Sequence, residues 1–376
     1  MTTQGKIKIL ETIRQGQVGG GETHVLDLVR KLDKSKFQVE VLSFTDGPMV
    51  DKLNALGINT YVIKTEKPFD FSIWGLVSDF ISNGGYHIIH AHGTRAASNI
   101  FHAAKKLNIP MIYTVHGWSF HNNQNYFVRR LRELSESFLT KKAIKTITVS
   151  ESNKTDGVNK FGLKRAQVIY NGIDDVKFDP EEDYNDVRAE LGIPKDKTLV
   201  GYLVRMTGQK DPFTMIKAIK KVSETNKNIM FLMVGNGDLL DATKKMASDL
   251  GVTDQIVFSN FRSDMPAILK AIDMYCLPSL WEGMPIGMLE AMAMGKACIA
   301  TSVDGTKELV NDGVNGLLIN KKDSDTLAKH IINLHLHPEK RAALGNNAKE
   351  YISKNFALNE MVSKIENVYE SVFKTL

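Results

Sequence analysis

Residues 274–302 read MYCLPSLWEGMPIGMLEAMAMGKACIATS. The run MYCLPS predicts a strand, the segment MLEAMAMG predicts the first turns of a helix, and ACIATS predicts a second strand. A strand, a helix and another strand in close succession indicate a βαβ unit, whose two strands lie parallel in one sheet. This stretch therefore predicts a parallel α/β fold for its part of the chain.

The same alternation extends over most of the 376 residues. The first part of the chain contains the strand-like runs KIKILETI, FQVEVLSF, TYVIK, HIIHAH, MIYTVH and TITVS. A polar segment, AQVIYNGIDDVKFDPEED, follows them as a domain connector would. New runs come after it: TLVGYLV, IMFLMVG, QIVFSNF, MYCLPS and ACIATS. We predict two Rossmann-like parallel-sheet domains, residues 1–170 and 171–355.

Residues 356–376 end the chain with a helix-like segment. Met361, Ile365, Val368 and Val372 are spaced along one helical face. We expect this helix to pack on a domain.

The ends and the cysteines of the chain bear on its location. The segment KIKILETIR lacks the apolar core and cleavage site of a signal peptide. No apolar run approaches the ~20 residues that a membrane-spanning helix needs. Cys276 and Cys298 lie in apolar runs, outside any metal-ligand spacing. We expect a cytoplasmic protein, soluble or peripheral on the inner face of the membrane, with both cysteines reduced.

The positive charge is concentrated in the first half of the chain. The net charge is +5, yet residues 1–180 have a balance of about +7 and the remainder about −2. Residues 126–145 contain six basic side chains: Arg129, Arg130, Arg132, Lys141, Lys142 and Lys145. This segment is either a solvated helix face or a patch that rests on anionic lipid. We expect no nucleic-acid partner, because no recognition motif accompanies the charge.

A glycine-rich turn follows the first predicted strand. Gly20 and Gly21 precede a helix, where a backbone can approach a ligand closely and free N–H groups can meet an anion. The spacing is not GxGxxG, although Glu40 or Asp46 could serve as the acid of a nicotinamide site. A tight turn without a ligand is the structural alternative.

Two cations follow the first strand of the second domain. Arg205 and Lys210 leave the run GYLV five residues apart, with Gly208 between them. Such a pair can bind a diphosphate, Arg through its planar fork and Lys as a point charge. A solvated loop with two exposed cations would have the same sequence.

Two glutamates in the opening stretch are separated by seven residues. Glu282 lies in the glycine-bearing loop and Glu290 in the helix that follows. If the segment from Glu282 to Glu290 were helical, its rise of ~1.5 Å per residue would place them ~12 Å apart, about the distance from hexose to ribose in a nucleotide sugar. Carboxylates accept hydrogen bonds from sugar hydroxyls, and the helix N-terminus between them could meet a diphosphate. Alternatively, Glu282 caps the helix and Glu290 is a surface residue.

Together these motifs resemble the retaining glycosyltransferases of family 4, also called glycosyl transferases group 1. Their architecture is GT-B, in which two Rossmann-like domains face a central cleft. The resemblance rests on the pair Glu282 and Glu290, on Arg205 and Lys210, on GGGETHVL, on His116 in YTVHG and on VIYNGID. It extends from Gly19 to about Ile319, and it implies that the final helix crosses back to the first domain.

The resemblance implies a role for each matching residue. Glu290 would bind the donor ribose, Glu282 the hydroxyls of the transferred sugar, and Arg205 with Lys210 the diphosphate. His116 would lie near the reacting sugar and Gly20 and Gly21 near the phosphates. The remaining donor contacts would come from Gly283, Met284, Pro285, Ile286, Phe261 and Arg262. Lys296, in place of a frequent proline, and Met284-Pro285, in place of an aromatic-glycine pair, leave the donor's identity open.

The resemblance also bears on mechanism and cofactors. Glu282 is the only acid that the motif places near the sugar carbon, which favours a front-face reaction over a two-carboxylate one. We expect no metal and no cofactor besides the nucleotide-sugar donor, because Arg205, Lys210 and the helix N-terminus supply positive charge. The DSD sequence at 323–325 reads as a helix N-cap. His90 and His92 end a strand, so either could line the cleft, but we expect backbone groups to satisfy them.

The expected function is transfer of a hexose from a UDP-sugar, or a GDP-sugar, to a saccharide or lipid-linked acceptor, as in bacterial surface polysaccharide synthesis. A nucleotide-sugar epimerase and a non-catalytic sugar-nucleotide-binding protein are the alternatives. A dehydrogenase and a phosphorylase are disfavoured, because their motifs are not present as sets.

Overall fold

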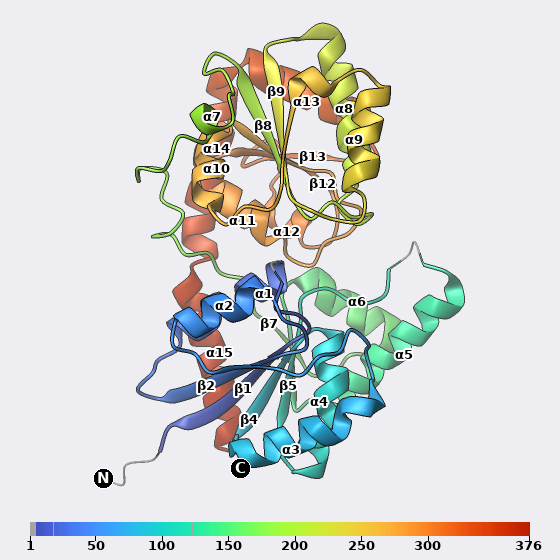
Figure 1. Cartoon of the computed structure of the whole chain (residues 1–376), viewed down its shortest axis with the longest axis vertical. Helices are drawn as coiled ribbons and strands as arrows, with labels where there is room; N and C mark the ends of the chain where they lie inside the picture. The colour runs from blue at the N-terminus through green and yellow to red at the C-terminus, as the bar shows by residue number, and fades with distance from the viewer. Residues whose placement is uncertain (1–4, 18, 122–123) are drawn as a thin grey trace. The chain divides into compact units, whose positions relative to one another are not determined.

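The computed structural model describes residues 5–17, 19–121 and 124–376, which form two compact units. Unit 1 comprises Met1–Gly172 and Leu358–Leu376, and unit 2 comprises Ile173–Ala357. Each unit contains one parallel sheet with helices packed on it (Figure 1). The predicted class, two parallel-sheet α/β domains, is confirmed.

Unit 1 is built on a seven-stranded sheet in the order β3-β2-β1-β4-β5-β6-β7, with every pair parallel. The order reverses between β1 and β4, which creates the switch point where open α/β sheets bind ligands. The strands are β1 Ile7–Ile13, β2 Phe37–Ser43, β3 Thr60–Val62, β4 Ile88–His92, β5 Met111–Val115, β6 Lys145–Thr148 and β7 Ala166–Val168.

Helices cover both faces of the unit 1 sheet. One apolar cluster joins the strands to α3, α4 and α5, and two others join them to α1, α2 and α15. The helices are α1 Gly20–Lys31, α2 Pro48–Ala55, α3 Trp74–Gly84, α4 Thr94–Lys106, α5 Tyr126–Lys142, α6 Glu151–Phe161 and α15 Leu358–Phe373. The short 3₁₀ helix η1, Phe71–Ile73, precedes α3.

The C-terminal helix α15 packs on the unit 1 sheet. Met361, Ile365, Val368 and Val372 are all buried, which confirms the predicted apolar face. In Figure 1 this red helix runs beside the blue strands, which it contacts at β4. Its Tyr369 is completely buried against them.

Unit 2 has a six-stranded parallel sheet in the order β10-β9-β8-β11-β12-β13, with its switch point between β8 and β11. The strands are β8 Thr198–Leu203, β9 Ile229–Val234, β10 Ile256–Ser259, β11 Met274–Leu277, β12 Ala297–Thr301 and β13 Leu317–Ile319. The predicted strands of both units are found. The short edge strands β7 and β13 were not predicted.

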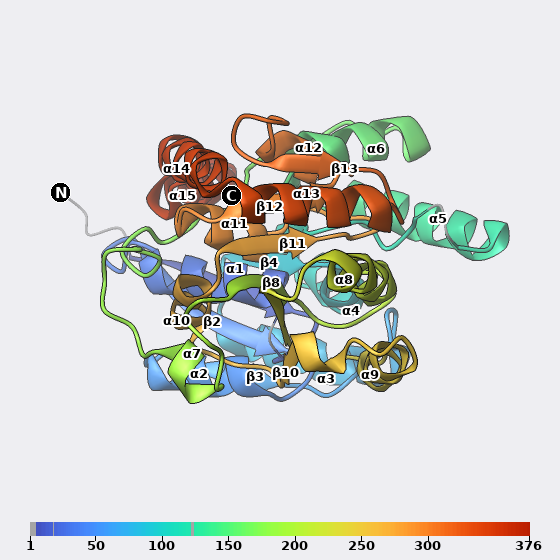
Figure 2. The same cartoon turned by 90° about the horizontal axis from the view of Figure 1, so that it is seen from above.

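The helices of unit 2 pack on this sheet and on one another. α8 and α13 lie side by side over its buried apolar residues (Figure 2). The helices are α7 Val187–Glu190, α8 Pro212–Thr225, α9 Leu240–Asp249, α10 Met265–Ala271, α11 Ile286–Ala293, α12 Thr306–Leu309, α13 Ser324–Leu336 and α14 Pro338–Asn355, with the 3₁₀ helix η2 Thr253–Gln255.

Three smaller features of the structure bear on the sequence analysis. Asp323 caps α13 by accepting a hydrogen bond from the backbone N–H of Thr326, as predicted. Cys276 and Cys298 are buried and free. Among the residues that the structure describes, no helix has both the length and the apolar character needed to cross a membrane.

Candidate active-site residues

The predicted donor-binding residues of unit 2 gather beyond its switch point. Arg205 and Lys210 follow β8, and Glu282 follows β11, the strand paired with β8. The Lys210 Nζ lies 2.5 Å from the Glu282 Oε1, although 72 residues separate them in the chain. Because strand ends meet at this edge, two motifs that are distant in sequence form one cluster.

Glu282 is held from several directions. Its side chain is 5% exposed, and its backbone N–H donates a hydrogen bond of 2.9 Å to the Asp304 Oδ2. The Gln209 Nε2 donates to the Trp281 carbonyl at 2.9 Å and to the Glu282 Oε2 at 3.4 Å. A buried carboxylate needs such partners to offset its lost hydration. The loop that carries Glu282 is therefore held by Gln209, which follows β8, and by Asp304, which follows β12.

Arg205 contrasts with Lys210. It is exposed, and within the described residues its guanidinium has no hydrogen bond or ion pair. A guanidinium with five unused donors can bind a phosphate bidentately. Arg205 is thus the cation of this cluster that remains available to an anionic ligand.

Glycines hold the Arg205 segment against its neighbours. A Cβ at Gly235 would lie 2.1 Å from the Val204 carbonyl oxygen, and one at Gly237 would lie 2.1 Å from that of Met206. Gly235 has a φ of +131°, which disfavours any other residue. The VGNGDL turn after β9 therefore supports the backbone on both sides of Arg205.

The segment from Glu282 to Pro285 is a loop, not the helix that the predicted spacing assumed. The helix begins only at Ile286, with Pro285 as its N-cap, so the rise of 1.5 Å per residue does not apply between Glu282 and Pro285. Glu282 does not cap the helix, and Glu290 is buried within it rather than on the surface. The first turn of α11 still offers backbone N–H groups, which have no partner within a helix.

Two other predicted donor contacts, Phe261 and Arg262, follow β10. Phe261 is 42% exposed. Arg262 forms ion pairs with Glu190 and with Asp264, the latter at 2.5 Å. These hydrogen bonds raise the pKa of Arg262 above its ordinary value. Arg262 therefore has carboxylate partners already, whereas Phe261 is open to a ligand.

In unit 1, His116 lies directly after β5 and packs against the start of α1. A Cβ at Gly21 would lie 3.3 Å from the His116 Cδ2, so the absence of a side chain there accommodates the imidazole. Gly20 is exposed at the same helix start. The structure thus brings Gly21 and His116 together, which their separation in sequence did not indicate.

His90 and His92 lie at the end of β4, as expected, but side chains rather than backbone groups satisfy them. The His90 ring nitrogens lie 2.7 Å from the Tyr369 hydroxyl and 2.7 Å from the Thr114 hydroxyl. The His92 Nε2 lies 2.8 Å from the Glu11 Oε2, and its Nδ1 lies 3.0 Å from the His116 Nε2. The expectation that backbone groups would bind the His90 and His92 rings was wrong. The backbone carbonyls and amides nearby are used in the pairing of β4 with β1 and β5.

Burial determines the charge state of this cluster. Burial would raise the pKa of Glu11, but the adjacent His90 and His92 outweigh it and hold that pKa well below the ordinary value. Burial, with His90 nearby, lowers the pKa of His92 to about 4. Burial, with His24 and His92 nearby, also lowers the pKa of His116 well below its ordinary value. At neutral pH both rings are therefore uncharged.

The same side chains have the composition of a metal site. His24, His92 and His116 offer ligand atoms within 4.8 Å of one another, and so do Glu11, His90 and His92. Hydrogen bonds within the cluster already use both ring nitrogens of His92. By contrast, the His116 Nδ1 and the His24 Nε2 are buried and have no hydrogen-bond partner among the described residues.

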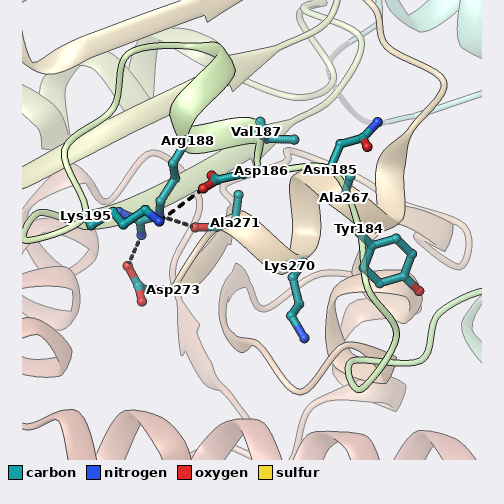
Figure 3. A pocket seen from close by; sticks show the side chains of 10 residues that line it. All are labelled: Tyr184, Asn185, Asp186, Val187, Arg188, Lys195, Ala267, Lys270, Ala271 and Asp273. Carbon is teal, nitrogen blue, oxygen red and sulfur yellow. Dashed lines mark hydrogen bonds and ion pairs between the residues drawn. The ribbon is translucent and has the colours of Figure 1, made fainter.

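A hollow of about 500 Å³ lies elsewhere on unit 2, beside α7 and α10. Figure 3 shows Arg188 and Asp273 on its wall, where the Arg188 guanidinium binds the Asp273 carboxylate at 2.8 Å and the Ala271 carbonyl at 2.8 Å. None of the predicted donor-binding residues lines it. Its polar groups join α7 to the sheet and α10, so we assign it a structural role.

The sequence reasoning missed several residues of both clusters. Asp304 and Gln209 brace Glu282, while Glu11 and Tyr369 anchor the histidines. Asp304 follows the predicted strand ACIATS, so its place at a strand end was a usable signal. Glu11 sits within a strand that is otherwise buried, which was a second signal.

Comparison with protein families covers most of the chain. The family model described as Glycosyltransferase Family 4 matches residues 18–177. The model described as Glycosyl transferases group 1 matches residues 183–351.

Several individual proteins are similar along nearly their whole length. The Escherichia coli UDP-Gal:alpha-D-GlcNAc-diphosphoundecaprenol alpha-1,3-galactosyltransferase is 27% identical, covering 98% of each chain. The D-inositol 3-phosphate glycosyltransferase of Salinispora arenicola is 23% identical over 94% of this chain and 87% of its own. The crystal structure of Anabaena HepE with UDP and glucose superposes with a TM-score of 0.87 at 24% identity, covering 97% of this chain and 100% of HepE.

Proposed function

The chain belongs to the glycosyltransferases of family 4 and has the GT-B fold, and on that premise we propose which sugar transfer it performs. It moves a hexose-type sugar from a UDP-sugar to a saccharide or lipid-linked acceptor, with retention of configuration and without a metal ion. The observation that carries the proposal is the cluster of Arg205, Lys210 and Glu282 at the switch point of unit 2.

The two cations of the cluster act on the donor diphosphate. Arg205 is exposed, has no partner among the residues that the structure describes, and can bind phosphate oxygens through two of its N–H groups. Lys210 is held 2.5 Å from Glu282 and so adds a positioned positive charge. As the glycosidic bond breaks, negative charge grows on the leaving diphosphate, and fixed cations stabilise that transition state. The N–H groups at the start of α11 add donors to the same region.

The sugar and the nucleoside are bound by the segment from Glu282 to Glu290. Glu282 accepts hydrogen bonds from hydroxyls of the transferred hexose, while Gly283 and the residues Met284, Pro285 and Ile286 present backbone groups to it. Glu290, on α11, accepts from the ribose. Phe261 packs against the base, and Arg262 borders it through its aliphatic stem, since Glu190 and Asp264 occupy its guanidinium.

Unit 1 contributes His116 near the reacting sugar, and Gly20 and Gly21 provide a close backbone approach for the donor. In the front-face reaction, the bond from the sugar carbon to the donor phosphate oxygen breaks first. The leaving phosphate then takes the proton of the acceptor hydroxyl, whose oxygen forms the new bond on the same face. Glu282 is paired with Lys210 and is not used as a nucleophile.

The relatives support the proposed donor and acceptor. The Escherichia coli enzyme is named for UDP-Gal and for a diphosphoundecaprenol-linked GlcNAc, and HepE was crystallised with UDP and glucose. We therefore place a UDP-sugar ahead of a GDP-sugar, and a lipid-linked saccharide of a bacterial surface polysaccharide as the acceptor. A nucleotide-sugar epimerase or a non-catalytic binding protein is not favoured, because the relatives above are named as transferases.

The test is release of nucleoside diphosphate by purified protein from a panel of UDP- and GDP-sugars, in EDTA, with and without membrane lipid extract. We expect release from one UDP-sugar that the extract enhances and that Arg205→Ala and Glu282→Gln abolish. Lys217→Ala, a change elsewhere in unit 2, is the matched control. Conversion of a donor to its epimer, or binding without turnover, would contradict the transferase.

Helix α5 favours contact of unit 1 with a membrane surface. The helix lies at the periphery of unit 1 in both views (Figures 1 and 2). Beside its basic residues it exposes apolar side chains that the charge count overlooked: Tyr126, Phe127, Val128, Leu131, Leu134 and Phe138. An exposed apolar face next to cations is complementary to an anionic bilayer. We propose that this face rests on anionic lipid and brings the protein to a membrane-bound acceptor.

Vesicle binding tests this contact. Phe127→Ser with Leu131→Ser should weaken binding to vesicles that contain phosphatidylglycerol, and Arg129→Glu, Arg130→Glu and Arg132→Glu together should weaken it further. Neutral phosphatidylcholine vesicles are the control. Unchanged binding in both variants would exclude α5 as the contact.

A further inference from the structure

Hydrogen bonds run in a line from Glu11 through His92 to His116. We propose that Glu11 and His92 are positioning residues that hold His116 in a single tautomer, with its Nε2 protonated and its Nδ1 open to accept a hydrogen bond from a sugar hydroxyl. This inference deepens the proposed function and rests on it for the identity of the ligand. The assignment of protons follows from the order of the contacts.

The first step is the carboxylate of Glu11. It is completely buried in β1, where its Oε1 lies 2.5 Å from the Tyr369 hydroxyl and its Oε2 lies 2.8 Å from the His92 Nε2. The adjacent histidines outweigh its burial and keep its pKa low, so it is ionised at neutral pH. An ionised carboxylate only accepts hydrogen bonds. The His92 Nε2 therefore carries a proton and donates a hydrogen bond to Glu11.

The second step is the imidazole of His92. Its pKa is lowered to about 4 by burial and by the nearby His90, so the ring is neutral and has one protonated nitrogen. Because that nitrogen is Nε2, Nδ1 has a lone pair. The His116 Nε2 lies 3.0 Å from this Nδ1. A hydrogen bond between them requires the proton on the His116 Nε2.

The third step is His116 itself. Burial lowers its pKa, so this ring is also neutral, and its Nδ1 must have a lone pair. That Nδ1 is buried, and within the part of the chain that the structure describes it has no hydrogen-bond partner. A buried acceptor without a partner is uncommon in folded proteins and suggests a missing donor. A hydroxyl of the bound sugar is the donor that the proposed reaction supplies.

His24 provides a second acceptor of the same kind. Its Nδ1 lies 2.9 Å from the Asn171 Oδ1, an oxygen that accepts, so its Nε2 has the lone pair. This Nε2 is also buried, without a partner among the described residues. The rings of His24 and His116 lie edge to face with centroids 4.8 Å apart. Two neutral acceptors next to one another suit a ligand with several hydroxyls rather than an anion.

The sheet fixes this arrangement. Glu11 pairs in register with His90, and Ile13 pairs with His92, so Glu11 and the two histidines share one face near the carboxyl ends of β1 and β4. His116 follows β5, the next strand, and packs against Gly21. The two residues that fix the His116 tautomer, Glu11 and His92, therefore lie on strands rather than on loops. We expect this arrangement to be rigid.

The test measures the tautomer directly, by ¹⁵N NMR of histidine-labelled protein at pH 7.5. In the wild type, we expect His116 to show a protonated Nε2 and an unprotonated Nδ1. In Glu11→Gln the amide N–H can donate to the His92 Nε2, which reverses the order and places the His116 proton on Nδ1. That variant should lose at least tenfold in kcat/KM for the UDP-sugar while its affinity for UDP, which lacks the sugar, is unchanged.

Tyr86→Phe is the control, because it removes a buried hydrogen bond to a different carboxylate of the same sheet, Glu40, and leaves the Glu11–His92–His116 order intact. It should keep both the wild-type tautomer and turnover within about twofold. A wild-type His116 with its proton on Nδ1, an unchanged tautomer in Glu11→Gln, or one equivalent of metal ion bound to these histidines would overturn the proposal. If Glu11→Gln does not fold, the wild-type spectrum still decides which nitrogen of His116 is protonated. That result does not depend on whether the protein transfers a sugar.

Discussion

The carboxyl edges of the two sheets have the same topology and opposite chemistry. In unit 2 the switch point has an exposed cation, Arg205, and a salt bridge between Lys210 and Glu282. In unit 1 it has the buried imidazole of His92, whose pKa is lowered to about 4, beside the buried Glu11, whose pKa is also lowered. The same strand order therefore places polar residues at the carboxyl edge of each sheet, and the two sets of residues differ in charge and burial.

The difference arises from where the polar residues stand relative to the strands. Arg205, Lys210 and Glu282 lie in loops after β8 and β11, where solvent can reach charged groups. Glu11 and His92 lie within β1 and β4, where charge is costly unless it is compensated. Unit 2 is thus suited to a charged diphosphate, and unit 1 to the hydroxyls of a sugar.

The largest expected effect concerns Arg205, the exposed cation of unit 2. Arg205→Ala should lower kcat by about 10²–10³, because a transition-state charge loses a preorganised donor. The midpoint of urea unfolding should not change, since the side chain has no partner within the described residues. Steady-state kinetics and urea titration measure the two effects. A loss of stability that matches the loss of activity would contradict the role as a ligand contact.

Lys210 should differ from Arg205 because it also neutralises a buried carboxylate. Lys210→Met leaves the Glu282 carboxylate without its cation and should destabilise the protein by about 3 kcal/mol, at the lower end of the range because the lysine is 20% exposed. Lys210→Met combined with Glu282→Gln should recover most of that stability but no activity. Equal stability of the single and double variants would disprove the coupling.

Acid should destabilise unit 1 before unit 2. The pKa of His24 is lowered to about 3 by burial and by His92, and that of His92 to about 4. In the unfolded chain, His24 and His92 take up protons near pH 6.5, whereas in the folded chain they take them up only at their lowered pKa values. The stability that these rings contribute is therefore complete above pH 6.5 and is lost as pH falls from 6.5 toward 4. Glu11, whose pKa is also lowered, adds a further loss at more acidic pH.

Urea unfolding at pH 7.5, 6.5, 5.5 and 4.5 tests this dependence. With Trp281→Phe the remaining tryptophans, Trp74 and Trp118, both lie in unit 1, so fluorescence reports on that unit alone. We expect the midpoint to fall steadily below pH 6.5 and the fall to be smaller in His24→Gln. A midpoint independent of pH in this range would contradict the neutral cluster.

The smallest effect should come from Arg262 in unit 2. Its guanidinium binds Glu190 and Asp264 near the surface, and exposed ion pairs contribute little. Arg262→Ala should reduce stability by less than about 1 kcal/mol and raise the KM for the donor less than threefold. A change as large as that of Arg205→Ala would show that Arg262 contributes to the donor contact as much as Arg205 does.

Sequence reasoning predicted the two parallel sheets, because buried strands and intervening helices leave a clear periodic pattern. The strands β7 and β13 were missed because three residues at a sheet edge carry little pattern. Arg205, Lys210 and Glu282 could be singled out because charged side chains follow predicted strands there. Asp304 and Gln209 also follow predicted strands, but their role, like that of Tyr369, depends on contacts across long stretches of sequence. The helical spacing assumed from Glu282 to Glu290 failed because Pro285 delays the start of α11.

Equilibrium binding of UDP in EDTA tests the central claim, that cations at the switch point of unit 2 hold the donor diphosphate. Calorimetry should show binding by the wild type that falls at least tenfold in Arg205→Ala, while uridine, which lacks phosphates, binds both proteins equally weakly. Glu11→Gln, in unit 1, should bind UDP as the wild type does. Equal affinity of Arg205→Ala and wild type for UDP, or binding that requires an added divalent metal, would contradict the account.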